Sequence, residues 1–561
     1  MNLRRATALG FLASLLLACT SGESGAPSAQ PGSPPPAATN SVPVPMAGAP
    51  LPYTPAQAAA AALPARTWLL TPEQYGRAVQ ALLGVAPDIS DLDSIPDTGV
   101  YPNMSASGVV RVNQATQYAT SAETVTSALS DAQLRALVPC GKLETSCKAE
   151  FLASSLRKAF RRPATADDSA RYGEIFDLAA ASGDLALAFR SVLRAVLTSP
   201  YFLYRTEIGA AADEQTPGFS LTGPEVASLL AFSIFGGPPD EALLAAAERG
   251  ELADAGRLKM QVTSLLSRPE AAEHFARFLA EWLRLHHFEE VEKFENVFPG
   301  FAGVKEAMFA EARGFLAQNG GMQGTLASLL TAPVGNSSSA LVAFYESDAS
   351  SVRGAQRIGL LSLGAVLSKT AKQYLTSPTQ RGLFIRDQLL CQHISLPENF
   401  TPPPIEAAEA RMAPKTTREL YDQHANNPVC AKCHALIDPL GYALEGFDGA
   451  GRVRASEIYR SPSFNAPSGA AEPVITSGTL VGTDVDRAFG SYVELAQALS
   501  ESSWVKECVA RQAFRYYFGQ LEQDRGNPAV VQGTQALLAK GTLGDLIASL
   551  LSSPSTLLRV R

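Results

Sequence analysis

The sequence predicts a mainly α-helical protein built from several packed helical domains, with at most a small β hairpin. Apolar residues recur at the spacing of a helix through most of the chain. Segments 71–74 and 165–168 each place a Thr before a polar residue three positions later, a pattern that begins helices. Strand-like runs are short, at 473–475 and 479–481, and these two are expected to pair as the hairpin.

The expected helices can be followed in order by their apolar stripes. The stripes are Tyr75, Val79, Leu82 and Leu83; Phe151, Leu152, Leu156 and Phe160; Val192, Leu193, Val196 and Leu197; Val226, Leu229, Leu230 and Phe232; and Phe275, Phe278, Leu279, Trp282 and Leu283. The third stripe ends near Ser199-Pro200, and the fourth opens at 221–224. We interpret all five as core-facing stripes and not as cofactor sites.

Length and charge limit the possible functions. The chain has 561 residues, 46% of them hydrophobic. Because a single core stops growing at roughly 250 to 300 residues, more than one packed unit is expected. The net charge is −8, with 46 Lys and Arg against 54 Asp and Glu. This balance offers no basic face for a polyanion, so no nucleic-acid partner is expected.

The N-terminus carries a predicted export signal over residues 1–18. Arg4 and Arg5 precede an apolar run at 6–18, which is shorter than the roughly 20 residues that span a bilayer. The run ends in Leu-Leu-Ala-Cys19, which resembles a bacterial lipobox, so Cys19 is expected to be lipidated. The alternative is an ordinary secretory signal with Cys19 incidental. In the favoured case the lipid anchors the exported protein to a bacterial membrane, with the outer membrane preferred.

The remainder of the chain is expected to form a stalk and five domains. Residues 19–66 are rich in Pro, Ala, Ser and Gly, a composition that favours a disordered stalk. The predicted helical domains cover 67–135, 136–210 and 211–350, followed by a haem-binding domain at 351–460 and a C-terminal helical domain at 461–561.

The segment Cys430-Ala-Lys-Cys433-His434 is the main chemical motif of the chain. A c-type haem needs two thiols that add to its vinyl groups and one imidazole that reaches the iron. Cys-x-x-Cys-His on a helical turn places all three on one side of the macrocycle. We therefore expect one covalent haem c, with His434 as the proximal iron ligand.

Two other uses of this motif are possible. A zinc site would use the same three residues, but it needs a fourth ligand and the chain has no second Cys-x-x-Cys. A thioredoxin-like redox pair would follow a strand in a βαβ unit, whereas 426–428 follows a helical stretch.

The remaining cysteines form an even set. Cys140, Cys147, Cys391 and Cys508 would sit in an oxidising compartment, where disulfides persist. Of the three possible pairings we favour Cys140 with Cys147 and Cys391 with Cys508. The alternative is four buried free thiols, because sequence alone does not show proximity.

The sixth position of the iron is open on sequence grounds. No Met follows Met412, so the candidates are His424, which is favoured, then Met412 and His393, or a water or open site. A six-coordinate iron shuttles electrons, whereas an open position can bind peroxide or dioxygen.

Other polar residues give weaker signals. Arg452 and Arg454 follow the motif and could clamp the haem propionates, although the simpler interpretation is two solvated arginines. His274, His286 and His287 form no recognisable ligand pattern, and acidic neighbours of the last two fit a Glu-rich helical surface. No nucleophile elbow, phosphate loop or His-Glu-x-x-His motif occurs, so no second catalytic centre is expected.

Several motifs resemble, in order, a family of large planctomycete and myxobacterial proteins that combine domains of unknown function with a cytochrome c motif. The matching segments are 70–75 with 82–84; 160–163; 197–205 with 238–240; 377–382 with the haem motif; and the tract around Cys508. The resemblance implies a helical, exported, haem-bearing protein, with ligation carried by Cys430, Cys433 and His434. Ile437 departs from the Met that family members often have there, so that Met is not a general requirement for iron ligation.

Three functions are compatible with the sequence. The favoured one is an exported, membrane-anchored cytochrome that transfers electrons through one haem to an unidentified redox partner. The second is a peroxidase-like or oxygenase-like haem enzyme acting on an unidentified small molecule, because the body is larger than an electron carrier needs. The third is a binding or scaffold lipoprotein with a structural haem.

Overall fold

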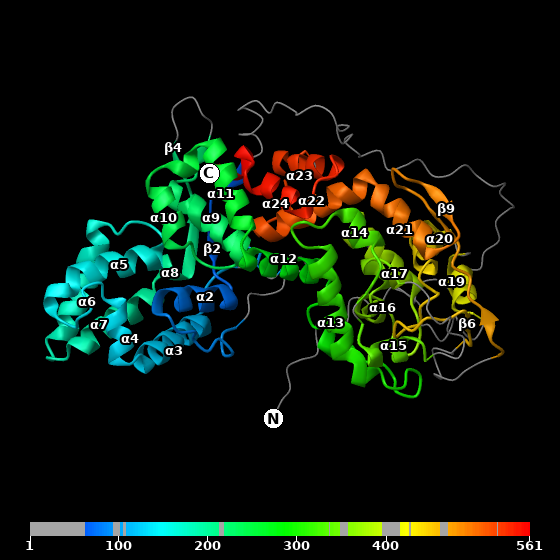
Figure 1. Cartoon of the computed structure of the whole chain (residues 1–561), viewed down its shortest axis with the longest axis horizontal. Helices are drawn as coiled ribbons and strands as arrows, with labels where there is room; N and C mark the ends of the chain where they lie inside the picture. Colours follow the sequence, from blue (N-terminus) through cyan, green and yellow to red (C-terminus); the bar gives the residue numbers. More distant parts are fainter. Residues whose placement is uncertain are drawn as a thin grey trace. The chain divides into compact units, whose positions relative to one another are not determined.

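The computed structural model consists mainly of helices, which confirms the predicted fold class (Figure 1). It describes residues 62–93, 101, 103–104, 108–211, 218–335, 337–347, 357–394, 416–425, 428–459, 469–523 and 526–560. These residues form two compact units. The motif unit lies within Ala276–Ala510 and Thr534–Gly544, and the N-terminal unit lies within Gly48–Phe275, Arg511–Gly533 and Asp545–Arg561.

The N-terminal unit is largely a helical bundle. Its helices include α2 (Pro72–Leu83), α3 (Val112–Ala128), α4 (Asp131–Leu137), α5 (Lys148–Phe160), α6 (Ala166–Ala180), α7 (Leu185–Leu197), α8 (Pro200–Leu203), α9 (Gly223–Phe235), α10 (Glu241–Glu248) and α11 (Ala255–Leu266). Capping boxes at Thr71, Thr165 and Thr222 begin α2, α6 and α9 where the sequence predicts helix starts. Aromatic rings at Phe151 and Phe189, 4.8 Å apart, lie in the core between α5 and α7.

The strands are short and pair across long stretches of chain. In the N-terminal unit, β1 (Leu63–Pro64), β10 (Leu558–Val560), β5 (Phe219–Ser220) and β4 (Ala210–Ala211) form a sheet in that order, and β2 (Arg66–Leu69) pairs antiparallel with β3 (Tyr204–Glu207). The predicted stalk is therefore wrong at its end, because residues 63–64 and 66 belong to strands. The amino-acid composition of this segment could not predict the pairing, because Leu63 pairs with Arg559, almost 500 positions away.

The motif unit contains the helices that surround Cys430–His434. They include α13 (Phe301–Asn319), α14 (Leu326–Thr331), α15 (Ser339–Tyr345), α16 (Gly364–Lys369), α17 (Pro378–Phe384), α19 (Thr417–Ala425), α20 (Pro428–Tyr442) and α21 (Tyr492–Glu501). A π-helical turn, η7 (Ile385–Leu389), follows α17 directly. The helices α12 (Pro269–Trp282), α22 (Ser503–Phe518), α23 (Pro528–Leu538) and α24 (Leu543–Leu551) each run from one unit into the other.

The predicted hairpin between 473–475 and 479–481 is wrong in its pairing. Instead β7 (Glu472–Pro473) pairs with β6 (Ser456–Glu457), and β8 (Gly478–Leu480) pairs with β9 (Arg487–Phe489). Each of the two short runs therefore pairs with a strand elsewhere in the chain and not with the other run, although the two are close in sequence. The loop carrying β8 instead packs against α20, where a Cβ on Gly478 would lie 2.7 Å from the Pro439 carbonyl oxygen.

Helices α17 and α20 cross at very close range, and two glycines permit it. A Cβ on Gly382 would overlap the Ile437 carbonyl, and a Cβ on Gly441 would overlap the Pro378 carbonyl. At each glycine an added Cβ would contact the backbone of the opposite helix, and backbone atoms cannot move aside as a flexible side chain can. The crossing fixes the position of α20, and with it the position of the Cys-x-x-Cys-His motif.

Substituting Gly441 with alanine is expected to destabilise the motif unit by about 3 kcal/mol, because the two backbones must separate. Gly314→Ala is the matched control, since Gly314 lies in α13 with nothing within 4 Å of an added Cβ. The control should be neutral or stabilising by up to about 1 kcal/mol through helix propensity. Urea unfolding of the two variants measures the difference; equal stabilities would show that the crossing is loose.

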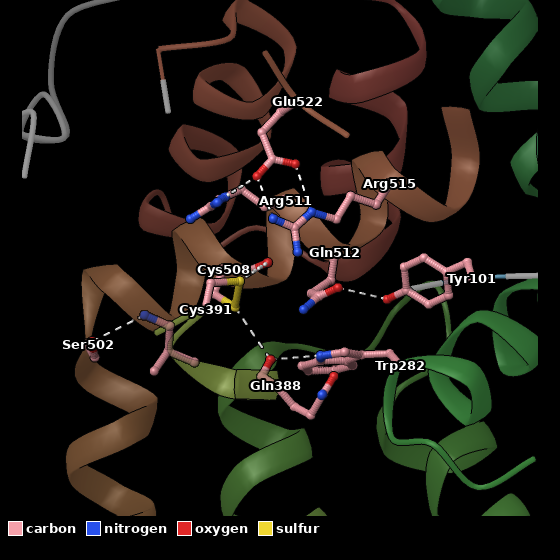
Figure 2. Close-up of a disulfide and its surroundings, with 11 residues drawn as sticks. Tyr101, Trp282, Gln388, Cys391, Ser502, Cys508, Arg511, Gln512, Arg515 and Glu522 are labelled. Carbon is pink, nitrogen blue, oxygen red and sulfur yellow. Dashed lines mark hydrogen bonds and ion pairs between the residues drawn. A yellow bond between two sulfur atoms is a disulfide. The ribbon is translucent and has the colours of Figure 1, made fainter. Parts of the chain in front are cut away.

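The two predicted disulfides are confirmed. Cys140 bonds to Cys147 in the N-terminal unit, and Cys391 bonds to Cys508 in the motif unit. Figure 2 shows the second bond joining the chain just after η7 to α22. Beside it the Trp282 indole N–H donates to the Gln388 carbonyl at 2.8 Å. This bond and this contact tie η7 to two other helices.

Several sequence predictions concern residues outside the described part of the chain. These are the signal segment 1–18, Cys19, residues 19–61 of the stalk, and Met412. Among the described helices, none has the length and apolar character needed to cross a membrane.

Candidate haem attachment site

Cys430, Cys433 and His434 lie together near the beginning of α20. Residues three and four positions apart share one face of an α-helix, so the two sulfurs and the imidazole point to the same side. Cys430 and His434 are buried, whereas Cys433 is partly exposed. The motif therefore has the one-sided arrangement that a c-type haem requires.

The two motif cysteines differ in their chemical state. Cys433 is a free thiol. Cys430 takes part in a disulfide. Covalent haem attachment consumes both thiols, so it requires that this disulfide be absent from the haem-loaded protein.

The imidazole of His434 is oriented by a buried carboxylate one turn further along α20. The His434 Nδ1 and Asp438 Oδ2 atoms are 2.8 Å apart. The other carboxylate oxygen, Oδ1, accepts a hydrogen bond from the Thr379 hydroxyl at 2.7 Å. All three side chains are buried. When Nδ1 carries the hydrogen and donates a hydrogen bond to Asp438, the other ring nitrogen, Nε2, has the free lone pair that an iron ion needs.

Thr379 reaches Asp438 because α17 crosses α20 so closely. Ser377 caps α17 by accepting a hydrogen bond from Gln380 N, and Pro378 occupies the first turn. Thr379 follows and is fully buried against α20. The glycine-mediated crossing thus produces the Thr379–Asp438–His434 chain, in which each member holds the next.

The π-helical turn η7 fixes α20 from a second direction. Arg386, which is 1% exposed, donates from Nε and Nη2 to the Leu436 carbonyl at 3.0 and 2.8 Å. Its Nη2 also donates to the Val481 carbonyl at 2.7 Å, in the loop after β8. A π-turn is rare and often marks a functional position. Here it places one guanidinium so that it joins η7, the middle of α20 and the β8 loop.

Arg452 and Arg454 are largely buried, with side chains 12% and 9% exposed, and engaged with carboxylates. Arg452 Nε lies 2.6 Å from Asp448 Oδ2, and Arg454 Nη2 lies 2.7 Å from Glu445 Oε2. Arg454 also pairs with Glu457 at 3.3 Å. The interpretation of the two arginines as solvated surface residues is therefore wrong, because the short segment after α20 folds back into the motif unit.

Both arginines line a cavity of 380 Å³, with Phe298, Tyr374 and Glu457 among its other walls. Arg381, fully buried, shares Glu445 with Arg454 at 3.1 Å. Burial raises the pKa of Glu445, while the two arginines oppose that rise. The cavity wall thus contains cations whose charge is already shared with protein carboxylates.

Three segments of the chain match family models. PSD5, a protein of unknown function (DUF1595), matches residues 147–207; PSD4, a protein of unknown function (DUF1592), matches 221–346; and PSCyt3, a protein of unknown function (DUF1588), matches 357–457. The chain belongs to the planctomycete-type family of multi-domain proteins of unknown function. No curated protein and no solved structure matches the chain.

The PSCyt3 segment contains nearly every feature of the candidate site. It includes α17, η7, the Cys430–His434 motif on α20, Asp438, and both Arg452 and Arg454. The β8 loop and the Cys508 half of the disulfide lie beyond it. The family segment therefore corresponds to the site, and more distant parts of this chain brace it.

Of the three residues predicted as sixth ligands, His393 is the one whose side chain the structure describes. His393 is 80% exposed, with its Nδ1 atom 3.4 Å from Asp387 Oδ1. His424 belongs to α19, but its side chain is outside the described residues. The choice among His424, Met412, His393 and an open site stays a prediction.

The remaining histidines separate into a core residue and a surface cluster. His274 is buried beside Tyr516, with ring centroids 5.4 Å apart. His287, Glu289 and Glu290 place their ligand atoms within 4.8 Å of one another, all exposed. Glu289 and Glu290 lie on a short 3₁₀ turn that begins just after His287, and not on the predicted Glu-rich helix; exposed groups of this kind often gather without a metal.

Three residues of the site carry roles that the sequence analysis did not assign. Asp438 stands four positions after His434, a spacing that alone suggests a carboxylate on the same helix face. Thr379 and Arg386 act across about 50 residues or more. No local pattern signals them.

Proposed function

We propose that this protein is an exported, lipid-anchored c-type cytochrome that transfers electrons. One haem is held covalently by Cys430 and Cys433, with His434 as the proximal iron ligand and lipid at Cys19 as the anchor. When bound, the haem supplies a single reversible electron at its iron. The protein's own residues hold the haem, orient the imidazole and cover one side of the site.

The observation that carries this proposal is the buried Thr379–Asp438–His434 chain. Metal-bound histidines usually donate their second N–H to a carboxylate or carbonyl, which fixes the tautomer and the plane of the ring. A histidine of a plain helical core has no need for a buried carboxylate, whose desolvation is costly. The donor set of two thiols and this oriented imidazole fits a haem c, provided that Cys430 is reduced.

A second function is supported by the same contact. A carboxylate that accepts the Nδ1–H makes the imidazole more electron-rich, and this favours reaction with peroxide when the iron has an open sixth position. In that case the protein is a peroxidase-like haem enzyme.

The proposal is tested by producing the full chain in a bacterium that can attach haem c. A denaturing gel stained for haem, followed by intact-mass measurement, should show one covalent haem per chain. Cys433→Ser should leave at most one thioether bond and shift the absorption bands, and Cys430→Ser/Cys433→Ser should abolish covalent haem. The matched control is Cys140→Ala/Cys147→Ala, which removes two cysteines from the N-terminal unit and should keep the haem.

Binding of carbon monoxide and reaction with peroxide distinguish the two candidate functions. Slow or absent binding of carbon monoxide to the reduced protein is expected for an electron carrier. Rapid binding of carbon monoxide and turnover of peroxide would identify the enzyme instead. A full chain without covalent haem in a competent host would contradict both.

A further inference from the structure

The N-terminal unit contains a cavity of 590 Å³ that is separate from the haem motif. Its volume lies in the range of small-molecule sites. The wall includes Phe160, Arg161, Arg162, Tyr201, Tyr204 and Arg205. These residues come from two family-like motifs, 160–163 and 197–205, that the proposed haem chemistry does not use.

Arg205 is the residue in this wall that lacks a compensating partner. It lies on β3 and is 3% exposed, yet its Nε and Nη1 atoms have no hydrogen-bond partner among the described residues. Its guanidinium instead lies between rings, with Cζ 3.5 Å from the centroid of Trp68 and 4.9 Å from that of Phe232. A buried cation without an acceptor is costly, so its retention calls for a reason.

The other two arginines of the cavity wall, Arg161 and Arg162, have acceptors within the protein. Arg161 donates to the carbonyls of Tyr201, Phe202 and Tyr204 at 2.8, 3.2 and 2.6 Å. Arg162 pairs with Asp168 at 2.7 Å. Among the described arginines of the cavity wall, Arg205 is thus the one without an acceptor.

Two carboxylates lie near the cavity, and one of them, Glu207, is engaged only through Oε2, since its Oε1 atom has no hydrogen-bond partner among the described residues. Arg66 and Arg559 share Glu207, and with Arg205 they lower its pKa to about 2 although burial alone would raise it. Glu225, in the wall, accepts from the backbone N–H groups of Ile208, Gly209 and Thr222. Burial lowers the pKa of Arg205 to about 9, and Glu207 only partly opposes this. The buried arginines Arg66, Arg161, Arg205 and Arg559 therefore outnumber the carboxylates Glu207 and Glu225 in this cluster.

We propose that this cavity binds a small ring-bearing monocarboxylate. The carboxylate lies against Arg205, and the ring lies against the aromatic wall formed by Phe160, Tyr201 and Tyr204. The planar guanidinium of Arg205, which lacks a hydrogen-bond acceptor at Nε and Nη1, matches the planar carboxylate of such a ligand. Flat aromatic walls favour a ring as its carrier.

The test is calorimetric titration of the full chain with benzoate, and with benzamide and inorganic phosphate in parallel. Benzoate should bind at one site per chain, and benzamide, which has the same shape without the charge, should bind at least about 10-fold more weakly. Failure of benzoate to bind, or equal binding of benzamide, would overturn the proposal. Tighter binding of phosphate than of benzoate would overturn the ligand class.

Arg205→Met should weaken benzoate binding by about 10- to 100-fold, because it removes a charged hydrogen-bond donor and keeps the apolar stem between the rings. Its melting temperature should be unchanged or higher, since an unsatisfied buried charge is lost. Unchanged affinity in this variant would contradict the proposed role of the guanidinium.

A second pair of variants tests the location of the binding site without changing Arg205. Val109 lies in the cavity wall and Val112 lies outside it, and the two side chains are 71% and 85% exposed. Val109→Trp should therefore obstruct benzoate binding while Val112→Trp leaves it intact. Equal effects of the two substitutions would place the binding elsewhere and overturn the assignment of the cavity.

Discussion

Replacing Cys391 and Cys508 together by alanine is expected to lower the free energy of unfolding of the motif unit by about 5 kcal/mol. The bond joins residues 117 positions apart, so its loss releases a long loop in the unfolded chain. It also frees the end of η7, whose Arg386 holds the middle of α20. Since small domains are stable by only about 5–15 kcal/mol, the variant is expected to be marginally folded at best.

The second disulfide provides a matched control. Cys140 and Cys147 are 7 positions apart, and their replacement by alanine should reduce stability by only about 2.5 kcal/mol. Both double variants leave no unpaired partner that could attack the motif cysteines. Denaturant unfolding without reductant, followed by tryptophan fluorescence, measures the two losses. Equal losses would mean that loop length does not determine the contribution of the Cys391–Cys508 bond.

The sequence predicts those parts of the fold that depend on local chemistry. The capping boxes at Thr71 and Thr165 involve residues three positions apart, so their patterns can be recognised directly. The sequence also predicts the disulfide pairing, because an even set of cysteines in an oxidising compartment offers few arrangements. By contrast, the pairing of Leu63 with Arg559 depends on the folded path of the whole chain.

The candidate sites divide in the same way. Cys430, Cys433 and His434 are visible as a motif, and Asp438 follows at helical spacing. Thr379 is brought to Asp438 only by the crossing of α17 and α20. Arg205 was equally hidden, since an arginine in a sequence is normally expected at the surface, and only the packing of Trp68 and Phe232 shows it to be buried.

In the proposed cytochrome, Asp438→Asn is expected to raise the reduction potential of the haem by about 60 to 120 mV. A carboxylate acceptor makes the proximal imidazole more basic and thereby stabilises the ferric iron; a neutral amide of the same shape removes that effect. Loss of such an outer contact typically changes metal affinity 10- to 100-fold, and a tenfold change corresponds to about 59 mV for one electron. Spectroelectrochemical titration of the haem-loaded full chain measures the shift.

Asp422→Asn is the matched control, because Asp422 also contacts α20, through the Tyr442 hydroxyl at 2.7 Å, but does not contact His434 among the described residues. Its potential should stay within error of the parent protein. If Asp438→Asn binds haem at an unchanged potential, Asp438 only positions the helix and does not tune the iron. If its potential rises while that of Asp422→Asn does not, the buried chain from Thr379 to His434 acts on the haem itself. Peroxide reactivity should then fall in the same variant, since a less basic imidazole supports it less well.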